Sequence, residues 1–332
     1  MAPATQYVDR SIPQISLARF EERIDHISQE IAAAAENVGF FSIIDHGISA
    51  REIEQMFANS EAFFALPEEI KASVPWNPQN VGYEFKSQVR PSTGAADNKE
   101  SHVPGFREQS LDFMFKVQAI SEKLMICLAR ALHFEDKYFM DWHDASKRDA
   151  QSTLRLLHYF ATPETNDGQT YHCAGSHADW GFLTLLLQRK GQSGLEIAPG
   201  REVVTKFNSG NAWTKVDFQN TTDIVCNIGD LLMSWSDDRF KSTFHRVKAP
   251  SEPGDNLGER YSIAFFNQPR KDALIQGPQK KYPLVTGGEF TKNAMSLYYS
   301  ALQEKREAQL ANTSMAAPDK FAKSSTVLAA SA

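Results

Sequence analysis

The sequence predicts a mainly β fold with flanking helices, in which two sheets pack together as a sandwich or barrel. Apolar residues recur at helical spacing before residue 150, whereas after it the apolar segments are short, β-like and separated by turn residues. Hydrophobic residues make up 42% of the 332 residues, enough for a large packed core. We expect one integrated domain: a mostly helical N-terminal region (1–150) packed on the core, a β core (151–290), and a C-terminal helix with a flexible tail (291–332).

Three amphipathic helices are predicted before residue 150. The first covers residues 17–39 and ends at a glycine, which suits a helix C-terminus. The second covers residues 49–67 and opens with Ser49 and Glu52, the spacing of a capping box. The third is long and covers residues 111–134.

The β core is predicted from a series of apolar segments bounded by turn residues. They are residues 152–161, 181–188, 194–199, 211–217, 223–235, 242–247 and 260–268. Several short strands separated by turns are typical of a sandwich or barrel. A last helix is expected over about residues 291–310.

Charge and cysteine content exclude several classes of protein. The formal net charge is −6, which disfavours nucleic acid and anionic membrane surfaces as partners. Cys127, Cys173 and Cys226 are scattered singly, which favours a reducing compartment. The N-terminal residues do not resemble a signal peptide, and no apolar run approaches the roughly 18 residues of a membrane span. We therefore expect a cytoplasmic protein without an obligate protein partner.

The segment GSHADWGFLTLLL, residues 175–187, places two polar side chains before an apolar run. On a strand, His177 and Asp179 would project to the same side, because alternate residues share a face. Burying both groups is costly unless something offsets their desolvation. A metal ion is one explanation, and a surface turn that only caps the strand is the other.

A third candidate ligand, His245, lies in the β-like segment STFHRV. Two histidines and one carboxylate match the facial triad of non-haem Fe(II) oxygenases, which leaves metal positions open for co-substrate and O2. His133 and Glu135 have the same local spacing as the first pair. They end a predicted helix, however, where residues two apart point in different directions.

A candidate carboxylate site lies in the segment ERYSIAFF. Arg260 and Ser262 are two residues apart, and a guanidinium beside a hydroxyl can bind a carboxylate in a fixed orientation. Tyr159, on a neighbouring predicted strand, offers a phenol. The alternative for Arg260 is an ordinary salt bridge.

Over about residues 10–300 the chain resembles the isopenicillin N synthase-like family of iron(II), 2-oxoglutarate-dependent oxygenases. The resemblance is carried by IPQISL, ENVGFFSIIDHGI, FFALPEEIK, NVGYEF, SHADWGFLTLLL, TDIVCNIGDLLMSWSDDRFKSTFHRV and ERYSIAFF. It implies a double-stranded β-helix, also called a jelly roll, with a cupin-like core. The implied Fe(II) ligands are His177, Asp179 and His245. The implied residues for the distal carboxylate of 2-oxoglutarate are Arg260, Ser262 and Tyr159.

The resemblance also implies the reaction. A non-haem Fe(II)/2-oxoglutarate-dependent dioxygenase, an oxidoreductase, consumes O2 and 2-oxoglutarate and releases succinate and CO2. The prime substrate is hydroxylated, desaturated, epoxidised or closed into a ring, and ascorbate is included as a reductant. Isopenicillin N synthase uses the equivalent Arg/Ser pair for its peptide substrate, so a 2-oxoglutarate-independent Fe(II) oxidase is the alternative. A Zn(II) hydrolase and a non-catalytic binding protein are further alternatives.

The predicted substrate is a small hydrophobic secondary metabolite, because aromatic residues are expected around the iron. Phe266 is expected to point toward the open iron positions, as a similar position does in flavonoid-oxidising relatives. The other expected pocket residues are Arg155, Tyr83, Phe85 and Trp180. Two departures from the plant enzymes affect this pocket: Leu157 replaces an asparagine, and the region at residues 101–106 is shorter.

Overall fold

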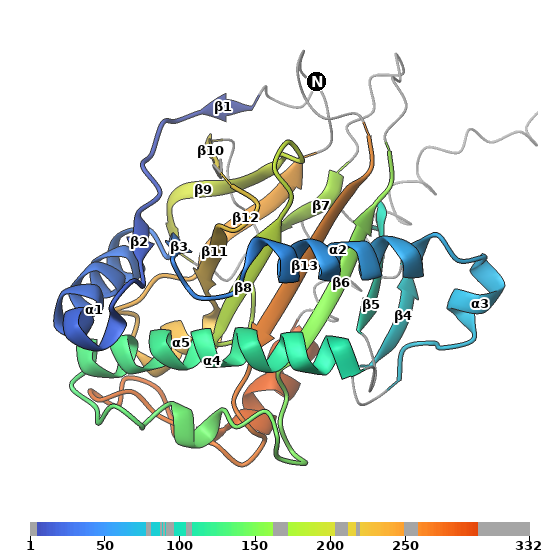
Figure 1. Cartoon of the computed structure of the whole chain (residues 1–332). Helices are drawn as coiled ribbons and strands as arrows, with labels where there is room; N and C mark the ends of the chain where they lie inside the picture. Colours follow the sequence, from blue (N-terminus) through green and yellow to red (C-terminus); the bar gives the residue numbers. More distant parts are fainter. Residues whose placement is uncertain are drawn as a thin grey trace, which may run out of the picture.

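The computed structural model of the chain has two β-sheets packed face to face, with helices on one side (Figure 1). It describes residues 5–77, 81–86, 88, 90, 96–103, 108–161, 172–202, 212–216, 220–248 and 258–297. The two-sheet arrangement is that of a double-stranded β-helix, so the predicted fold class is confirmed. Residues 104–106 of the shortened region, residues 298–310 of the last predicted helix and the tail after it lie outside the described residues.

The larger sheet has eight strands and the smaller sheet five. In spatial order, the larger sheet contains β2 (Gln14–Ser16), β3 (Phe40–Ile44), β11 (Ile224–Ile228), β8 (Leu183–Gln188), β13 (Arg260–Asn267), β6 (Thr153–Tyr159), β5 (Lys99–Val103) and β4 (Gly82–Phe85). The smaller sheet contains β1 (Gln6–Tyr7), β10 (Ala212–Lys215), β9 (Leu195–Glu202), β12 (Thr243–Lys248) and β7 (His172–His177). A separate short hairpin pairs β14 (Leu274–Ile275) with β15 (Val285–Thr286).

Alternation along the strands separates the helical side of the larger sheet from the interior between the sheets. On β13, Ile263 and Phe265 belong to the core that packs against the helices, whereas Ala264 belongs to a cluster between the sheets. The period of two therefore also turns Arg260 and Ser262 into the interior. This is the space in which the predicted site residues can meet.

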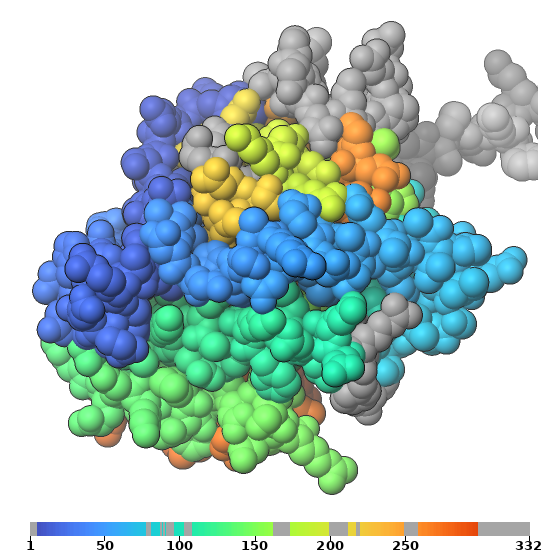
Figure 2. Space-filling view, viewed as in Figure 1, coloured from blue at the N-terminus to red at the C-terminus, as the bar shows by residue number. Residues whose placement is uncertain are grey.

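Three long helices cover the larger sheet: α1 (Phe20–Asn37), α2 (Ala50–Phe64) and α4 (Glu108–Ala131). Figure 2 shows them lying against one another as a continuous layer. The capping box predicted at α2 is confirmed, because Ser49 and Glu52 exchange their side-chain-to-backbone hydrogen bonds. Shorter helical elements are α3 (Glu68–Ala72), a 3-10 turn (Met140–Trp142), α5 (Asp230–Trp235) and residues 287–297.

Two expectations about secondary structure are corrected by the structure. Residues 223–235 are not one β-like segment, because β11 ends at Ile228 and α5 begins at Asp230. The N-terminal 150 residues are not only a helical cover, because β2, β3, β4 and β5 join the larger sheet. Those strands have three to five residues each, too short for a clear alternating pattern.

Gly229, between β11 and α5, leaves no room for a side chain. A Cβ on Gly229 would collide with the carbonyl oxygen of Gly181, because the start of α5 packs directly on the turn before β8. The backbone of this helix start also donates hydrogen bonds from Asp230 to Asp179 O at 2.8 Å and from Leu231 to Gly181 O at 3.1 Å.

Among the helices that the structure describes, none has the length and apolar composition to cross a lipid bilayer.

Replacing Gly229 with alanine is expected to lower the free energy of unfolding by about 1–3 kcal/mol, because the new methyl group must displace backbone. Urea denaturation followed by tryptophan fluorescence measures the change. Gly288→Ala is the control, because its added Cβ would lie 3.4 Å from Lys271 Cβ, an ordinary contact. An equal loss of stability in both variants would contradict the packing argument.

Candidate active site

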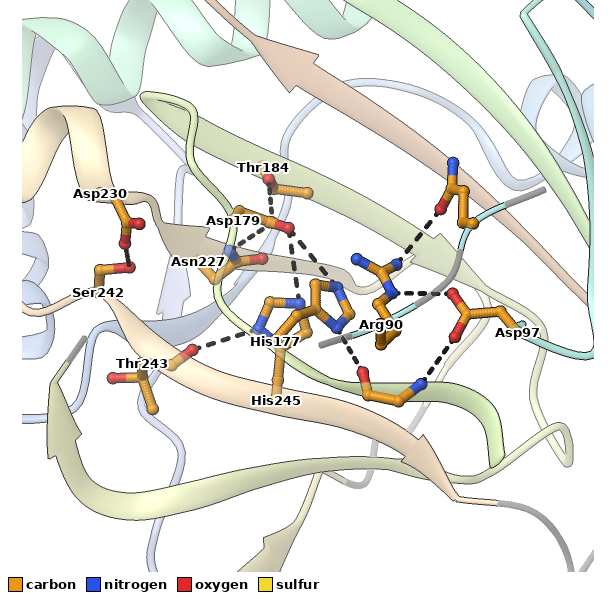
Figure 3. Close-up of polar contacts among 12 residues, drawn as sticks. Arg90, Asp97, His177, Asp179, Thr184, Asn227, Asp230, Ser242, Thr243 and His245 are labelled. Atoms are coloured by element: carbon orange, nitrogen blue, oxygen red, sulfur yellow. Dashed lines mark hydrogen bonds and ion pairs between the residues drawn. The ribbon is translucent and has the colours of Figure 1, made fainter. Parts of the chain in front are cut away.

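His177 and His245 lie side by side in the smaller sheet. The antiparallel pairing of β7 with β12 sets His245 opposite His177, and their ring centroids are 4.3 Å apart. Asp179 approaches from the connection that leads to β8. One ligand atom from each of the three residues lies within 4.8 Å of the others (Figure 3).

The expectation that His177 and Asp179 share a strand face is wrong, although the two side chains do converge. His177 is the last residue of β7, and Asp179 lies beyond the strand. The turn is held by the backbone of α5, which donates from Asp230 N to Asp179 O. The position of Asp179 thus depends on a helix start some fifty residues later in the chain.

One oxygen of the Asp179 carboxylate accepts the hydrogen bonds that hold this side chain. Its Oδ2 accepts hydrogen bonds from Thr184 Oγ1 at 2.6 Å and from Asn227 Nδ2 at 2.8 Å. Its Oδ1 lies 3.8 Å from His177 Nε2 and 3.7 Å from His245 Nε2. The outer oxygen is therefore fixed by the larger sheet, and the inner oxygen faces the two imidazoles.

Both imidazoles have the orientation that a metal site needs. His177 Nδ1 lies 2.7 Å from Gly175 O, and His245 Nδ1 lies 3.2 Å from Thr243 O. A neutral ring that donates from Nδ1 to a carbonyl presents the Nε2 lone pair to the centre of the triad. Burial and the nearby Arg90 guanidinium lower the pKa of His177 well below its ordinary value, which favours the neutral form.

These donors fit an Fe(II) ion. Two neutral nitrogens and one anionic oxygen are the ligand set of the facial triad, and they approach one point from one side. In the part of the chain that the structure describes, no second group of three or more His, Cys, Asp or Glu side chains meets the same distance criterion.

Arg260, Ser262 and Tyr159 also come together in the interior. Arg260 pairs with Tyr159 across β13 and β6, and its guanidinium carbon lies 4.8 Å from the centre of the phenol ring. Ser262 is fully buried on the same strand. Burial raises the pKa of Tyr159, so the phenol stays protonated and can donate.

Among the described residues, no carboxylate forms a salt bridge with the guanidinium of Arg260. It donates from Nε to Gln192 O at 3.2 Å and from Nη2 to Gln188 Oε1. Its Nη1 is buried and has no hydrogen-bond partner among the described residues. A buried unpaired donor on a cation is costly, so this corner of the interior is suited to an anionic ligand.

The predicted substrate-pocket residues do not all lie on the interior face of the larger sheet. Arg155 and Phe266 lie on the interior face, with the Arg155 guanidinium carbon 5.9 Å from the centre of the Phe266 ring. Trp180 follows Asp179 in the turn and is exposed.

Tyr83 and Phe85 are corrections to the predicted pocket. In β4 they pair with His102 and Glu100, on the face turned toward α2 and α3. The Tyr83 hydroxyl donates to Glu100 Oε2, and the Phe85 ring meets Phe160 edge-on at 5.8 Å. The two aromatic residues therefore face away from the triad, because the register of β4 against β5 sets their side.

Sequence reasoning missed the residues that surround the triad. Thr184 and Asn227 could have been found from alternation, since both lie on the interior face of strands next to Asp179. Arg90 and Asp97 lie outside the strands and Lys99 is only the first residue of β5, so no periodic pattern marked them. Tertiary structure alone brings them to the triad.

Asp230 lies behind the triad and is half-buried. Its Oδ1 accepts a hydrogen bond from Ser242 Oγ at 2.6 Å. Burial raises the pKa of Asp230 to about 7, and the negative charge of Asp179 acts in the same direction. The acid is therefore largely protonated below neutral pH in the metal-free protein.

Comparisons with known proteins agree with this geometry. Residues 12–110 match the model of the N-terminal region of a non-haem dioxygenase in morphine synthesis, and residues 151–269 match the 2OG-Fe(II) oxygenase superfamily. Proline hydroxylase buaE of Petromyces alliaceus is 30% identical, over 75% of this chain and 83% of its own. Gibberellin 2-beta-dioxygenase 4 of Arabidopsis thaliana is 30% identical, over 87% of this chain and 92% of its own.

Solved structures give the same result. A full-length Neurospora crassa protein, crystallised in complex with alpha-KG, superimposes with a TM-score of 0.71 at 25% identity and covers 89% of this chain and 98% of its own. The same Neurospora crassa protein has also been solved with alpha-KG and thymine. The class is thus that of enzymes that couple Fe(II), 2-oxoglutarate and O2.

The chain belongs to the 2OG-Fe(II) oxygenase superfamily. It is an Fe(II)- and 2-oxoglutarate-dependent dioxygenase, an oxidoreductase, as the sequence resemblance implied. The 2-oxoglutarate-independent oxidase is not favoured.

The raised pKa of Asp230 predicts how stability depends on pH. Because the folded protein binds this proton more tightly than the unfolded chain, stability is fully present at low pH and is lost as pH rises through about 7. Between pH 5 and pH 8, the metal-free wild-type protein should lose free energy of unfolding that Asp230→Asn does not lose. The expected difference between the two proteins is on the order of 2 kcal/mol. Urea denaturation at the two pH values measures this, and equal losses in both proteins would contradict it.

Proposed function

We propose that His177, Asp179 and His245 hold Fe(II). We also propose that the guanidinium, phenol and hydroxyl groups of Arg260, Tyr159 and Ser262 bind 2-oxoglutarate. The observation that carries the proposal is the convergence of both Nε2 atoms and Asp179 Oδ1 on one point. When bound, iron supplies the activation of O2 that drives oxidative decarboxylation of 2-oxoglutarate and oxidation of the prime substrate.

Arg260, Ser262 and Tyr159 are the proposed partners of the distal carboxylate of 2-oxoglutarate. The buried Nη1 of Arg260 is a ready donor to such an anion, and Ser262 lies two residues further along the same strand face. Leu157, Ala264 and Val247 form an apolar cluster around Tyr159, which suits the methylene chain of the co-substrate and excludes water.

We propose that the prime substrate is a small hydrophobic secondary metabolite that is hydroxylated, desaturated, epoxidised or cyclised. Phe266 and Trp180 are its proposed aromatic contacts, with Arg155 beside Phe266. A small molecule rather than a macromolecule is supported by the thymine complex of the Neurospora crassa protein and by the gibberellin named for the plant relative.

A library of polyketides, terpenoids, alkaloids and flavonoids tests this proposal. The Fe(II)-loaded enzyme is supplied with 2-oxoglutarate, ascorbate and air, and succinate release is measured for each compound. Product mass spectrometry should show a gain of one oxygen or a loss of two hydrogens. Turnover only of peptidyl or protein side chains would refute the assignment.

A cytoplasmic location is also proposed. All three cysteines, Cys127, Cys173 and Cys226, are buried and unpaired, as expected in a reducing compartment. Fractionation of expressing cells that finds the protein outside the cytosol would contradict this location.

Arg260→Lys is expected to raise the apparent KM for 2-oxoglutarate at least tenfold, because a point charge cannot replace a fork of donors. Steady-state kinetics with 2-oxoglutarate varied at saturating prime substrate measure the effect. If the variant changed only the KM for the prime substrate, Arg260 would not be the co-substrate anchor.

A further inference from the structure

The metal ligand His177 ends a strand whose pairing is irregular. Ala174 lies three residues before His177, but its partner on β12 lies only two residues from the partner of His177. Two residues of β7, Gly175 and Ser176, thus lie opposite a single residue of β12, which is the pattern of a β-bulge. A bulge leaves one residue outside the regular ladder and redirects the side chains next to it. The direction of the His177 imidazole therefore depends on how this bulge is held.

A buried carboxylate just before β5 holds the bulge. Asp97, whose side chain is 2% exposed, accepts a hydrogen bond through Oδ1 from Gly175 N at 2.9 Å. The carbonyl oxygen of the same glycine lies 2.7 Å from His177 Nδ1 (Figure 3). Asp97 and His177 are thus connected through one residue, by a bond to its N–H and a bond to its carbonyl.

Asp97 is itself fixed on several sides. Its backbone N–H donates to Gln88 O at 2.9 Å, and its Oδ2 contacts Arg90 Nε at 2.9 Å and Lys99 Nζ at 3.4 Å. Burial opposes ionisation, but the two cations lower the pKa of Asp97 below its ordinary value. The side chain is therefore an anion, with one oxygen turned to the cations and the other to Gly175. A hydrogen bond to an ionised acceptor is stronger than one between neutral groups.

We propose that Asp97 is a positioning residue for the iron centre, which sets the orientation of the His177 imidazole by fixing Gly175. The inference rests on the proposed function, because it requires that His177 holds the metal. Groups that orient a ligand without touching the metal commonly change the metal affinity by about 10- to 100-fold when they are removed.

The charge of Asp97 offers a different explanation for any effect on metal binding. The carboxylate pairs with Lys99, whose Nζ stands 5.8 Å from the centre of the Tyr159 ring. Removing the carboxylate would make the surroundings of the triad more positive by one charge, which disfavours a metal cation even if His177 does not move. An experiment must therefore separate the hydrogen bond to Gly175 from the charge.

Co(II) is the probe, because its visible absorption bands report coordination geometry without turnover. The full-length protein is titrated with Co(II) alone, and the dissociation constant and the bands are recorded. Asp97→Ala should weaken Co(II) binding by about tenfold or more and should change the bands. The double variant Asp97→Ala/Lys99→Met removes one anion and one cation, so it keeps the local net charge, and it should show the same loss. Lys99→Met alone should bind Co(II) no more weakly than the wild type, with unchanged bands.

The matched control is Glu100→Ala. It also removes a buried carboxylate with a lysine partner, Lys71 at 2.7 Å, but on the face of the larger sheet turned toward α3. It should lower the Tm and keep the Co(II) affinity and bands of the wild type. The double variant also serves if Asp97→Ala does not fold, because Lys99 is removed together with its carboxylate.

Wild-type affinity and bands in the double variant would overturn the inference, and so would equal changes in Glu100→Ala. The proposed function is checked separately with His177→Ala. If that variant bound Co(II) as tightly as the wild type, the metal assignment itself would fail, whatever the Asp97 variants showed.

Discussion

The pairing of β7 with β12 is the constraint on which the rest of the site depends. It places two imidazoles opposite each other on antiparallel strands, where the backbone fixes their separation and the adjacent carbonyls fix their tautomers. The third ligand, Asp179, lies in neither of these strands. The chain supplies it from the turn that leaves β7 for the larger sheet, so the triad stands at the junction of the two sheets.

This arrangement explains why distant elements converge on one carboxylate. Thr184 and Asn227 reach Asp179 from β8 and β11, and the first turn of α5 holds its backbone. Gly229 is required there because α5 packs on the turn itself. A single orientation of Asp179 therefore results from the larger sheet, the helix start and the turn acting together, which is the preorganisation that a three-ligand metal site needs.

The sequence predicted the features that depend on local pattern. The two-sheet core followed from short apolar segments, the capping box of α2 from Ser49 and Glu52, and the convergence on His245 from residue types and spacing. It did not predict that Asp179 leaves the strand, because the turn is held by a hydrogen bond from Asp230, some fifty residues later in the chain. The side of Tyr83 and the cluster around Asp97 depend on strand register and on contacts between segments far apart in the chain, which no local pattern records.

The measurement that tests the metal assignment most directly is an anaerobic crystal structure of the protein with Fe(II). We expect one ion at about 2.0–2.2 Å from His177 Nε2, His245 Nε2 and Asp179 Oδ1, with Asp179 Oδ2 still bonded to Thr184 and Asn227. An ion bound elsewhere, or bound here without one of these three atoms at full occupancy, would contradict the assignment.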